Sequence, residues 1–337
     1  METLELLRTL TAAPGVSGTE DATADAIEAI MRKYTDDIRR DALGNLICEI
    51  NPGKEKSIML VAHMDKIGLS VTGIDRETGF LRVAKCGGTD LRTLAASRVK
   101  VYGKETLDGV VISVPPHLAD KSSDNKATPV DKTAVDCGLP YEEIAAKVSV
   151  GDRIEIRLPY MPLLGSRVSS PYIDDTAGCA AIIETVDALQ GREFPYTVCA
   201  VFSTREEVGK QGAKTAVFGV DPDEAIAVDV GFALQKGVAE DEGAKLGSGA
   251  RIGIAPVLTK SMSDELKRLA SVQDIPYTVE VMGRSTGTDA DVTMCSKSGV
   301  KTALISVPLK NMHTPVETAD LNDIEAVSRL MTAYITR

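Results

Sequence analysis

Two adjacent glutamates, Glu206 and Glu207, stand where an apolar segment ends and a turn begins. The segment covers residues 198–202, and the turn ends at Gly209. Two neighbouring like charges at such a place are costly unless a positive group lies near them. Elsewhere the chain supplies side chains that suit a pair of metal ions, namely His63, Asp174, Asp229 and His313. This set of residues predicts a metal-dependent hydrolase.

These candidates occupy similar places in the predicted structure, because each lies just after a strand or just before a helix. His63 and Asp65 follow 58–62, Glu206 and Glu207 follow 198–202, Asp229 follows 225–228, His313 lies beyond 303–307, and Asp174 precedes a helix at about 176. In open α/β sheets, ligands bind outside the carboxyl ends of the strands. We therefore expect these side chains to meet at one edge of a sheet.

The residue types suit two divalent metal ions. Carboxylates and imidazoles bind Zn²⁺ well, and Co²⁺ or Mn²⁺ suits the same ligands. Two ions about 3.5–4 Å apart can share a carboxylate and a water. Asp174, Glu207 and Asp229 with a bridging hydroxide would balance two such ions, leaving His63 and His313 as neutral ligands.

Two further side chains would complete the chemistry. Glu206 remains as a carboxylate close enough to take a proton from the water between the ions. Asp65 lies two residues after His63 and could accept its second ring N–H, which would fix the tautomer.

Composition sets the remaining bounds. The 337 residues are 43% hydrophobic and 26% charged, which suits one or two globular domains with a large core. The formal net charge of -11 argues against general nucleic-acid binding and against anionic membranes. Aromatic residues make up 4% of the chain, with no Trp, which weakens any function that stacks sugars or bases on indole rings.

The sequence also predicts where in the cell the protein is found. Residues 1–8 fit an amphipathic helix and lack the basic flank and apolar stretch of a signal peptide. No run approaches the roughly 18 apolar residues of a membrane span. The six cysteines are scattered without a Cys-x-x-Cys pair, so we expect free thiols and a reducing cytoplasm.

Strand and helix patterns alternate over most of the chain. Helical patterns lie near 4–10, 20–33, 176–189, 263–272 and 321–336, and strand patterns near 45–50, 57–61, 196–202, 225–228, 277–282 and 302–307. Such alternation predicts an α/β fold with a mostly parallel central sheet flanked by helices.

One segment, 70–158, breaks this rhythm with short strand runs, many turn residues and a single helical pattern near 142–147. We expect 1–69 and 159–337 to form the catalytic domain and 70–158 a small inserted all-β, barrel-like domain. Its chain entry and exit should lie close together. The polar stretch 120–132 is expected to be a mobile loop.

Each feature has an ordinary structural explanation when it is taken alone. A lone His-x-Asp is a weak signal, adjacent glutamates usually lie on a solvated surface, and Asp174 and Asp175 could simply cap a helix. Their shared position at strand ends favours the metal site. The segment 287–290 could line a pocket or cap a helix through Asp289, and His117 is expected to be structural.

Six motifs in order make a more specific pattern. They are Ala-His-Met-Asp-Lys-Ile-Gly at 62–68, Asp-Asp-Thr-Ala-Gly at 174–178, Glu-Glu-Val-Gly-Lys-Gln-Gly-Ala at 206–213, Ala-Val-Asp-Val at 227–230, Gly-Thr-Asp-Ala at 287–290 and His-Thr-Pro-Val-Glu at 313–317. Over essentially its whole length, the chain resembles the cytoplasmic di-metal aminopeptidases that include the tetrahedral (TET-type), glutamyl and deblocking enzymes. Some members of that group carry an endoglucanase label.

The resemblance implies a ligand role for five matching residues. Asp174 would bridge the two ions, His63 and Asp229 would complete one site, and Glu207 and His313 would complete the other. It also implies a cis peptide bond between Asp174 and Asp175.

The same resemblance implies the other functional assignments. Glu206 would be the general base, and Asp65 would orient His63. The inserted domain would be a dimerisation domain, with assemblies from dimers to tetrahedral dodecamers. Lys66 stands where an acidic residue is common, and Lys-Gln at 210–211 replaces a more usual Leu-Arg, which bears on substrate preference rather than on the ligands.

The sequence therefore predicts a metal-dependent aminopeptidase that removes N-terminal residues from peptides. The metals would polarise the scissile carbonyl, and Glu206 would pass the proton of the bridging water to the leaving amine. The alternatives are a metal-dependent hydrolase of another bond, such as a deacylase or endoglucanase, and a catalytically silent metal-binding scaffold. Glycoside hydrolysis normally uses two carboxylates without metal. Peptides and further copies of the chain are the expected partners, not nucleic acid or membranes.

Overall fold

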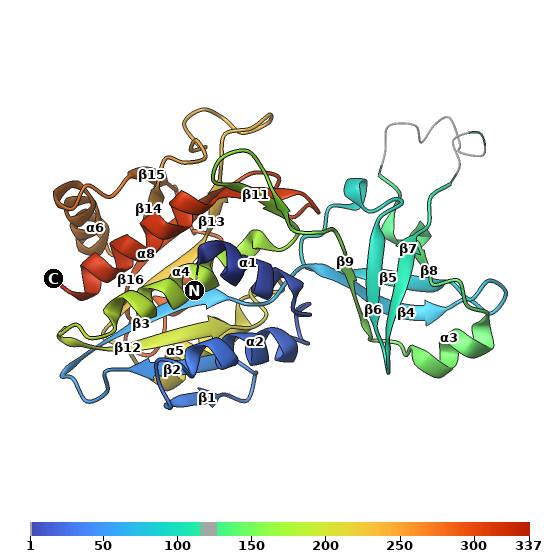
Figure 1. The fold of residues 1–337 in the computed structure, drawn as a ribbon, viewed down its shortest axis with the longest axis horizontal. Coiled ribbons are helices and arrows are strands. Elements are labelled where there is room, and N and C mark those ends of the chain that lie inside the picture. Colours follow the sequence, from blue (N-terminus) through green and yellow to red (C-terminus); the bar gives the residue numbers. More distant parts are fainter. Residues whose placement is uncertain (1, 115–116, 118–126) are drawn as a thin grey trace.

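The structure, a computed structural model, describes residues 2–114, 117 and 127–337. Most of the loop expected over 120–132 lies outside the described residues. The chain forms a large α/β body and a smaller barrel beside it (Figure 1).

Eight strands build the sheet of the large body. They are β1 (Ile38–Arg40), β2 (Leu46–Ile50), β3 (Lys56–His63), β12 (Tyr196–Ser203), β13 (Glu224–Phe232), β14 (Ala250–Ile254), β15 (Tyr277–Val281) and β16 (Lys301–Leu309). Their order is β1-β2-β12-β3-β13-β16-β14-β15. The four central strands, β12, β3, β13 and β16, run parallel, whereas β2 and β14 pair antiparallel with their inner neighbours. The carboxyl ends of the four parallel strands therefore meet at one edge.

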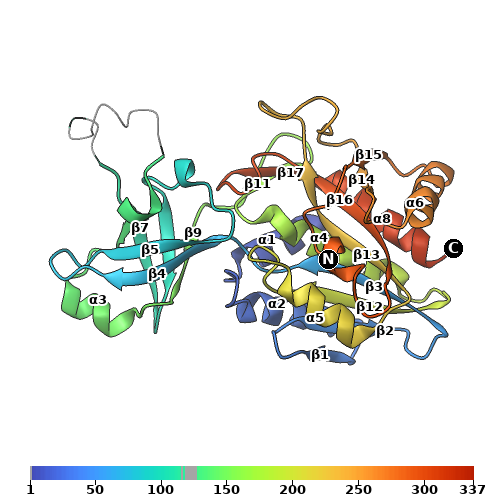
Figure 2. The same cartoon turned by 180° about the vertical axis from the view of Figure 1, so that it is seen from behind.

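Helices cover both faces of this sheet. On one face lie α1 (Thr3–Ala12), α2 (Asp21–Met31), α4 (Ile173–Leu189), α6 (Lys260–Val272) and α8 (Leu321–Ile335). On the other lie α5 (Gln211–Val220), seen from behind in Figure 2, and the short α7 (Ala290–Thr293). Successive residues of β3 face alternate layers, with Leu60 in the first core and Val61 in the second. Both faces of the strand are buried, which explains its continuous apolar run.

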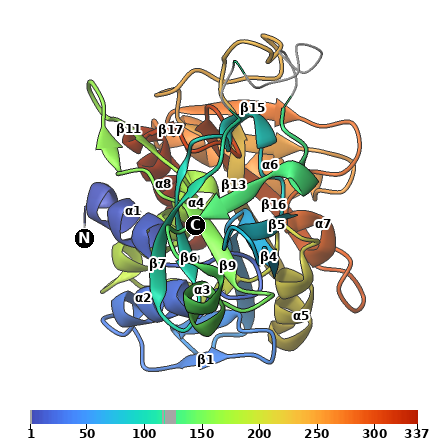
Figure 3. The ribbon, with the colours of Figure 1, turned by 90° about the vertical axis from the view of Figure 1, so that its right-hand side faces the viewer.

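The barrel consists of six antiparallel strands. They are β4 (Gly68–Ile74), β5 (Leu81–Cys86), β6 (Arg98–Tyr102), β7 (Thr106–Val111), β8 (Ala134–Asp136) and β9 (Arg153–Ile156), closed in the order β4-β5-β8-β7-β6-β9. Figure 3 views the molecule from this side, with the barrel in front of the large body. The barrel has its own core, which includes Ile144 of α3 (Tyr141–Lys147). Leu69 pairs with Ile154, so the chain enters and leaves the barrel on adjacent strands.

A small third sheet joins β10 (Met161–Pro162), β11 (Arg167–Ser170) and β17 (Glu317–Asp320), all antiparallel. After β11 the chain reaches α4 through a short turn, and after β17 it enters α8 directly. This sheet thus holds two segments far apart in sequence against each other.

The predicted fold class is confirmed: a largely parallel sheet flanked by helices carries an inserted barrel. The peptide bond between Asp174 and Asp175 is cis, as the resemblance implied. All six cysteines are free. Within the described ranges, no helix has both the length and the apolar character that crossing a membrane requires.

Candidate metal centre

The register of the central strands brings the predicted site residues together. His63 ends β3, and its parallel partner in β12 is Ser203, three residues before Glu206. Asp229 lies in β13, and His313 follows β16 after a short loop. Parallel strands end at the same edge, so side chains that are far apart in the sequence converge there.

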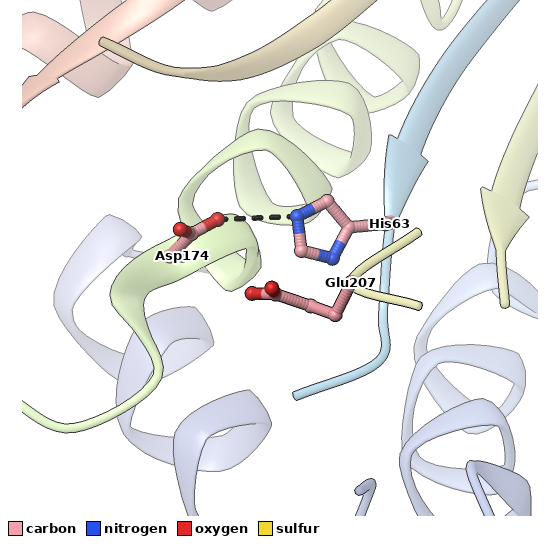
Figure 4. Close-up of side chains that lie close together, drawn as sticks. All are labelled: His63, Asp174 and Glu207. Atoms are coloured by element: carbon pink, nitrogen blue, oxygen red, sulfur yellow. Dashed lines mark hydrogen bonds and ion pairs between the residues drawn. The ribbon is translucent and has the colours of Figure 1, made fainter. Parts of the chain in front are cut away.

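The Asp174 carboxylate lies between two imidazoles. Its Oδ1 is 3.1 Å from Nε2 of His63, and its Oδ2 is 3.3 Å from Nε2 of His313. Nε2 of His313 is also 3.4 Å from Oε1 of Glu207. Figure 4 shows Asp174, His63 and Glu207 pointing toward one another from α4, β3 and the segment after β12. One oxygen facing each histidine is the arrangement that a bridging carboxylate needs.

Two groups of side chains have the spacing of metal ligands. Donor atoms of His63, Asp174 and Glu207 lie within 4.8 Å of one another, and so do those of His63, Asp175 and Asp229. Asp229 is thus grouped with Asp175, to which the sequence analysis gave no metal role. Oδ1 of Asp175 accepts the Gly178 N–H at 2.9 Å, while its buried Oδ2 has no hydrogen-bond partner among the described residues. The adjacent Asp-Asp pair was the only sequence signal for this residue.

The pKa values show that the site attracts positive charge. Burial raises the pKa of Glu207, Asp175 and Asp229, with neighbouring carboxylates adding to the shift. Burial alone would lower the pKa of His63, but hydrogen bonds to Asp174 and Asp65 raise it well above its usual value.

The second imidazole behaves in the same way. Hydrogen bonds to Asp174 and Glu207 raise the pKa of His313 to about 11. Such a group of buried acids needs cations or protons to be stable. Divalent cations would supply that charge, and the mixed carboxylate and imidazole donors fit them.

Asp65 accepts hydrogen bonds from the backbone of the segment that carries Glu206 and the candidate ligand Glu207. Its Oδ1 accepts the Glu206 N–H at 2.9 Å, and its Oδ2 accepts the Glu207 N–H at 3.2 Å and the Ser17 hydroxyl at 2.6 Å. Nδ1 of His63 lies 3.1 Å from the backbone carbonyl of Asp65 and 3.4 Å from its Oδ1. His63 Nδ1 therefore lies near both the backbone carbonyl and the carboxylate of Asp65, whereas only the carboxylate had been expected. The same carboxylate also binds the backbone of Glu206 and Glu207.

The barrel reaches the site through the loop after β5. A Cβ at Gly88 would lie 2.3 Å from Nδ1 of His313, and one at Gly87 would lie 3.2 Å from Cβ of Glu207. Only a residue without a side chain allows such a close approach at Gly88. The barrel and the ligand residues therefore share a packed boundary.

A cavity of about 400 Å³ opens onto these residues. Besides His63, Asp174, Glu206, Glu207, Asp229 and His313, its lining comprises Gly209, Lys210, Val230–Phe232, Glu280, Thr286–Thr288 and Met312. Gly287 and Thr288 thus line the pocket, which was one of the two alternatives for the segment 287–290. The side chain of Asp289 does not cap α7 and instead accepts the Ser203 hydroxyl at 2.5 Å.

Two further charged side chains, Lys210 and Glu280, also face this cavity. Nζ of Lys210 is 3.6 Å from Oε1 of Glu206. Oε1 of Glu280 is 3.1 Å from the guanidinium of the buried Arg251. Burial, with nearby carboxylates, raises the pKa of Glu206 to about 8. Sequence patterns did not single out Glu280, because it lies on a short strand with no motif around it.

Comparison with known proteins identifies the family. The family model described as M42 glutamyl aminopeptidase matches residues 44–330. The chain belongs to the M42 glutamyl aminopeptidase family. A lysyl aminopeptidase of Pyrococcus furiosus is 35% identical over 98% of this chain and 96% of its own length. The family resemblance inferred from the motifs is thus confirmed.

Solved structures of TET peptidases share the whole fold. A TET aminopeptidase from a marine-sediment Thaumarchaeota archaeon has a TM-score of 0.93 at 28% identity, covering 99% of this chain and 97% of its own. The TET1 peptidase of Pyrococcus horikoshii has a TM-score of 0.89 at 33% identity, with both chains fully covered. That peptidase can assemble into a tetrahedron or a large octahedral shell. The likeness therefore includes both bodies of the chain.

We expect Asp65→Asn to weaken metal binding by about 10–100-fold, since the amide would place a donor against one of the N–H groups that Asp65 now accepts. Ser17→Ala is the matched control, because it removes one contact of Asp65 and leaves Glu206 and Glu207 bound to it. Titration of the metal-free proteins with Zn²⁺ or Co²⁺ measures the effect. Wild-type affinity in Asp65→Asn would remove this residue from the support of the site.

Proposed function

We propose that this chain is a metal-dependent aminopeptidase that hydrolyses N-terminal residues from peptides. The observation that carries the proposal is Glu206, a partly buried carboxylate in the cavity wall beside the two groups of candidate ligands. A site that only bound metal would not require this additional carboxylate. Membership of an aminopeptidase family supports the choice of bond.

We assign two divalent ions to the ligand set, with Zn²⁺ first and Co²⁺ or Mn²⁺ as alternatives. Asp174 would be shared, His63 and Asp229 would hold one ion, and Glu207 and His313 the other. The spacing of the two ligand groups supports this assignment, with Asp175 as a further donor beside Asp229. Ions at such a centre act as Lewis acids on a carbonyl and make water more acidic.

The chain's own residues then account for proton movement. The Glu206 carboxylate takes a proton from the attacking water and gives it to the leaving amine. Lys210 nearby favours the charged form of Glu206 before the transfer, while burial favours the protonated form after it. Glu280 is the lining carboxylate that is neither a ligand nor the general base, and it would hold a free α-ammonium group and limit cleavage to chain ends.

The other functions considered from the sequence are not favoured. Relatives over nearly the full length are named aminopeptidases, which argues against a deacylase or an endoglucanase. A silent scaffold would leave the placement of Glu206 unexplained.

We propose a homo-oligomer in which the barrel domain, residues 70–158, supplies a dimer interface. The shell-forming TET1 peptidase, matched over its entire length, supports assembly. Six free cysteines support a reducing compartment such as the cytoplasm.

Aminoacyl chromogenic substrates test the function directly. The metal-loaded protein should release the chromophore from substrates with a free α-amino group and not from N-acetylated forms, because the site is proposed to bind the charged amine. Chelation should abolish the activity, and added Zn²⁺, Co²⁺ or Mn²⁺ should restore it. Activity that survives complete metal removal would exclude the proposed chemistry.

Glu206→Gln should keep its metal content and lose about 10²–10⁴-fold in kcat, since it preserves shape but cannot accept a proton. Glu55→Gln is the control, because Glu55 is exposed just before β3, at the opposite end of that strand from His63. Steady-state kinetics and metal analysis of both variants test whether Glu206 is the general base. A near-normal rate in Glu206→Gln would remove it from the mechanism.

Replacing residues 70–158 by a short glycine linker should give a smaller oligomer if the barrel carries an interface. The deletion is feasible because β4 and β9 pair at Leu69 and Ile154, next to the two cut points. Size-exclusion chromatography with light scattering gives the mass, and circular dichroism checks that the α/β body is folded. A folded variant with the oligomer size of the full chain would contradict the interface.

A further inference from the structure

We propose that Glu317 is a positioning residue for the metal centre. Its carboxylate fixes the spacing between the segment that carries Asp174 and the segment that carries His313. This inference rests on the proposed function, because it concerns the ligands of the metal-dependent reaction. The residue closes the motif 313–317, in which only His313 had been given a role.

Within the described residues, the Glu317 carboxylate accepts hydrogen bonds only from backbone N–H groups of the two segments that carry Asp174 and His313. Its Oε2 accepts the N–H groups of Ile173 at 2.7 Å and Asp174 at 3.1 Å. Its Oε1 accepts the N–H group of His313 at 2.8 Å. The side chain is 1% exposed, so these bonds are shielded from water. One rigid group thus ties together two segments that are 139 residues apart in the chain, as 313 − 174 shows.

Strand register explains why Glu317 reaches both segments. Glu317 begins β17, and its antiparallel partner in β11 is Ser170. The chain continues from Ser170 to Asp174 in a single short turn, while His313 lies four residues before Glu317. The small third sheet therefore presents the carboxylate at the point where both ligand segments leave it.

Both segments are held in an uncommon backbone conformation. Tyr172 has φ 68° and His313 has φ 62°, in the left-handed region that residues with a bulky side chain rarely adopt. Such conformations persist where surrounding contacts enforce them. The N–H bonds to Glu317 lie within two residues of Tyr172 on one side and at His313 itself on the other. Glu317 is therefore placed to enforce both.

Glu317 acts through other residues rather than on the metal itself. Both of its oxygens are occupied by backbone N–H groups, and neither ligand group contains it. A glutamine amide has the shape of this carboxylate, but only one of its two terminal atoms can accept a hydrogen bond, so it cannot accept all three N–H groups in the same way.

Glu317→Gln tests the proposal, with Asp323→Asn as the matched control. Asp323 is also buried and accepts two backbone N–H groups, from Gly247 at 2.8 Å and Gly249 at 2.6 Å, neither of which carries a ligand. Each metal-free variant is titrated with Zn²⁺ and Co²⁺, the visible absorption of bound Co²⁺ is recorded, and thermal unfolding is measured without metal.

The expected results distinguish an effect on the position of the metal ligands from an effect on the stability of the fold. Both variants should unfold at lower temperature than the parent, because each loses a buried acceptor. Only Glu317→Gln should bind the ions about 10–100-fold more weakly and shift the Co²⁺ spectrum. Parent-like affinity and spectrum in Glu317→Gln, or an equal loss in Asp323→Asn, would overturn the proposal.

Glu317→Asp covers the case in which the glutamine variant does not fold. The shorter side chain keeps the charge but cannot span both segments, so metal affinity should again fall, and parent-like affinity would overturn the proposal. Failure of the proposed function has a different signature. A parent protein that binds metal but cleaves no aminoacyl substrate would count against the function alone.

Discussion

The structure of the site depends on one constraint, the gathering of carboxylates at a buried sheet edge. Asp174, Asp175, Glu207 and Asp229 approach one another where water is largely excluded, and the pKa of most of them rises in consequence. Asp174 is the exception, because hydrogen bonds to the two histidines outweigh burial and lower its pKa. Negative charge is concentrated here because the four parallel strands end together. The same concentration that would destabilise the fold gives the edge the charge and the donor atoms that suit divalent cations.

Two further carboxylates fix the backbone around the site. Asp65 and Glu317 do not face the cavity, and each accepts backbone N–H groups from segments that carry ligands. Asp65 holds the turn with Glu206 and Glu207, and Glu317 holds the turns with Asp174 and His313. Hydrogen bonds to the backbone fix the spacing of the Cα positions that carry the candidate ligands, so that only the rotamers of those side chains remain to be set. This is how irregular turns can carry a site that needs a well-defined geometry.

The barrel takes part in this arrangement rather than only extending from it. β4 starts five residues after His63, as 68 − 63 shows, and the loop after β5 returns to pack Gly88 against His313. Lys66, between these elements, donates hydrogen bonds to Leu10 and Thr11 at the carboxyl end of α1, where orphan carbonyls need donors. The departure from an acidic residue at this position therefore has a structural role, since Lys66 is fully buried. Any interface on the barrel would lie on a body in direct contact with the ligand loops.

Sequence alone determined the fold class and predicted most of the side chains that meet at the sheet edge. Apolar runs followed by His63, Glu206 and Asp229 identify buried strands and their polar ends, because strand burial and chain direction are local properties. Helix α5 and strand β14 escaped prediction. The first contains two glycines, and the second is a short run interrupted by the buried Arg251. The grouping of Asp175 with Asp229, the shared backbone contact of Asp65 and the bracing by Glu317 appeared only in three dimensions. They depend on the register between strands distant in the chain, such as Ser170 opposite Glu317, which no local pattern encodes.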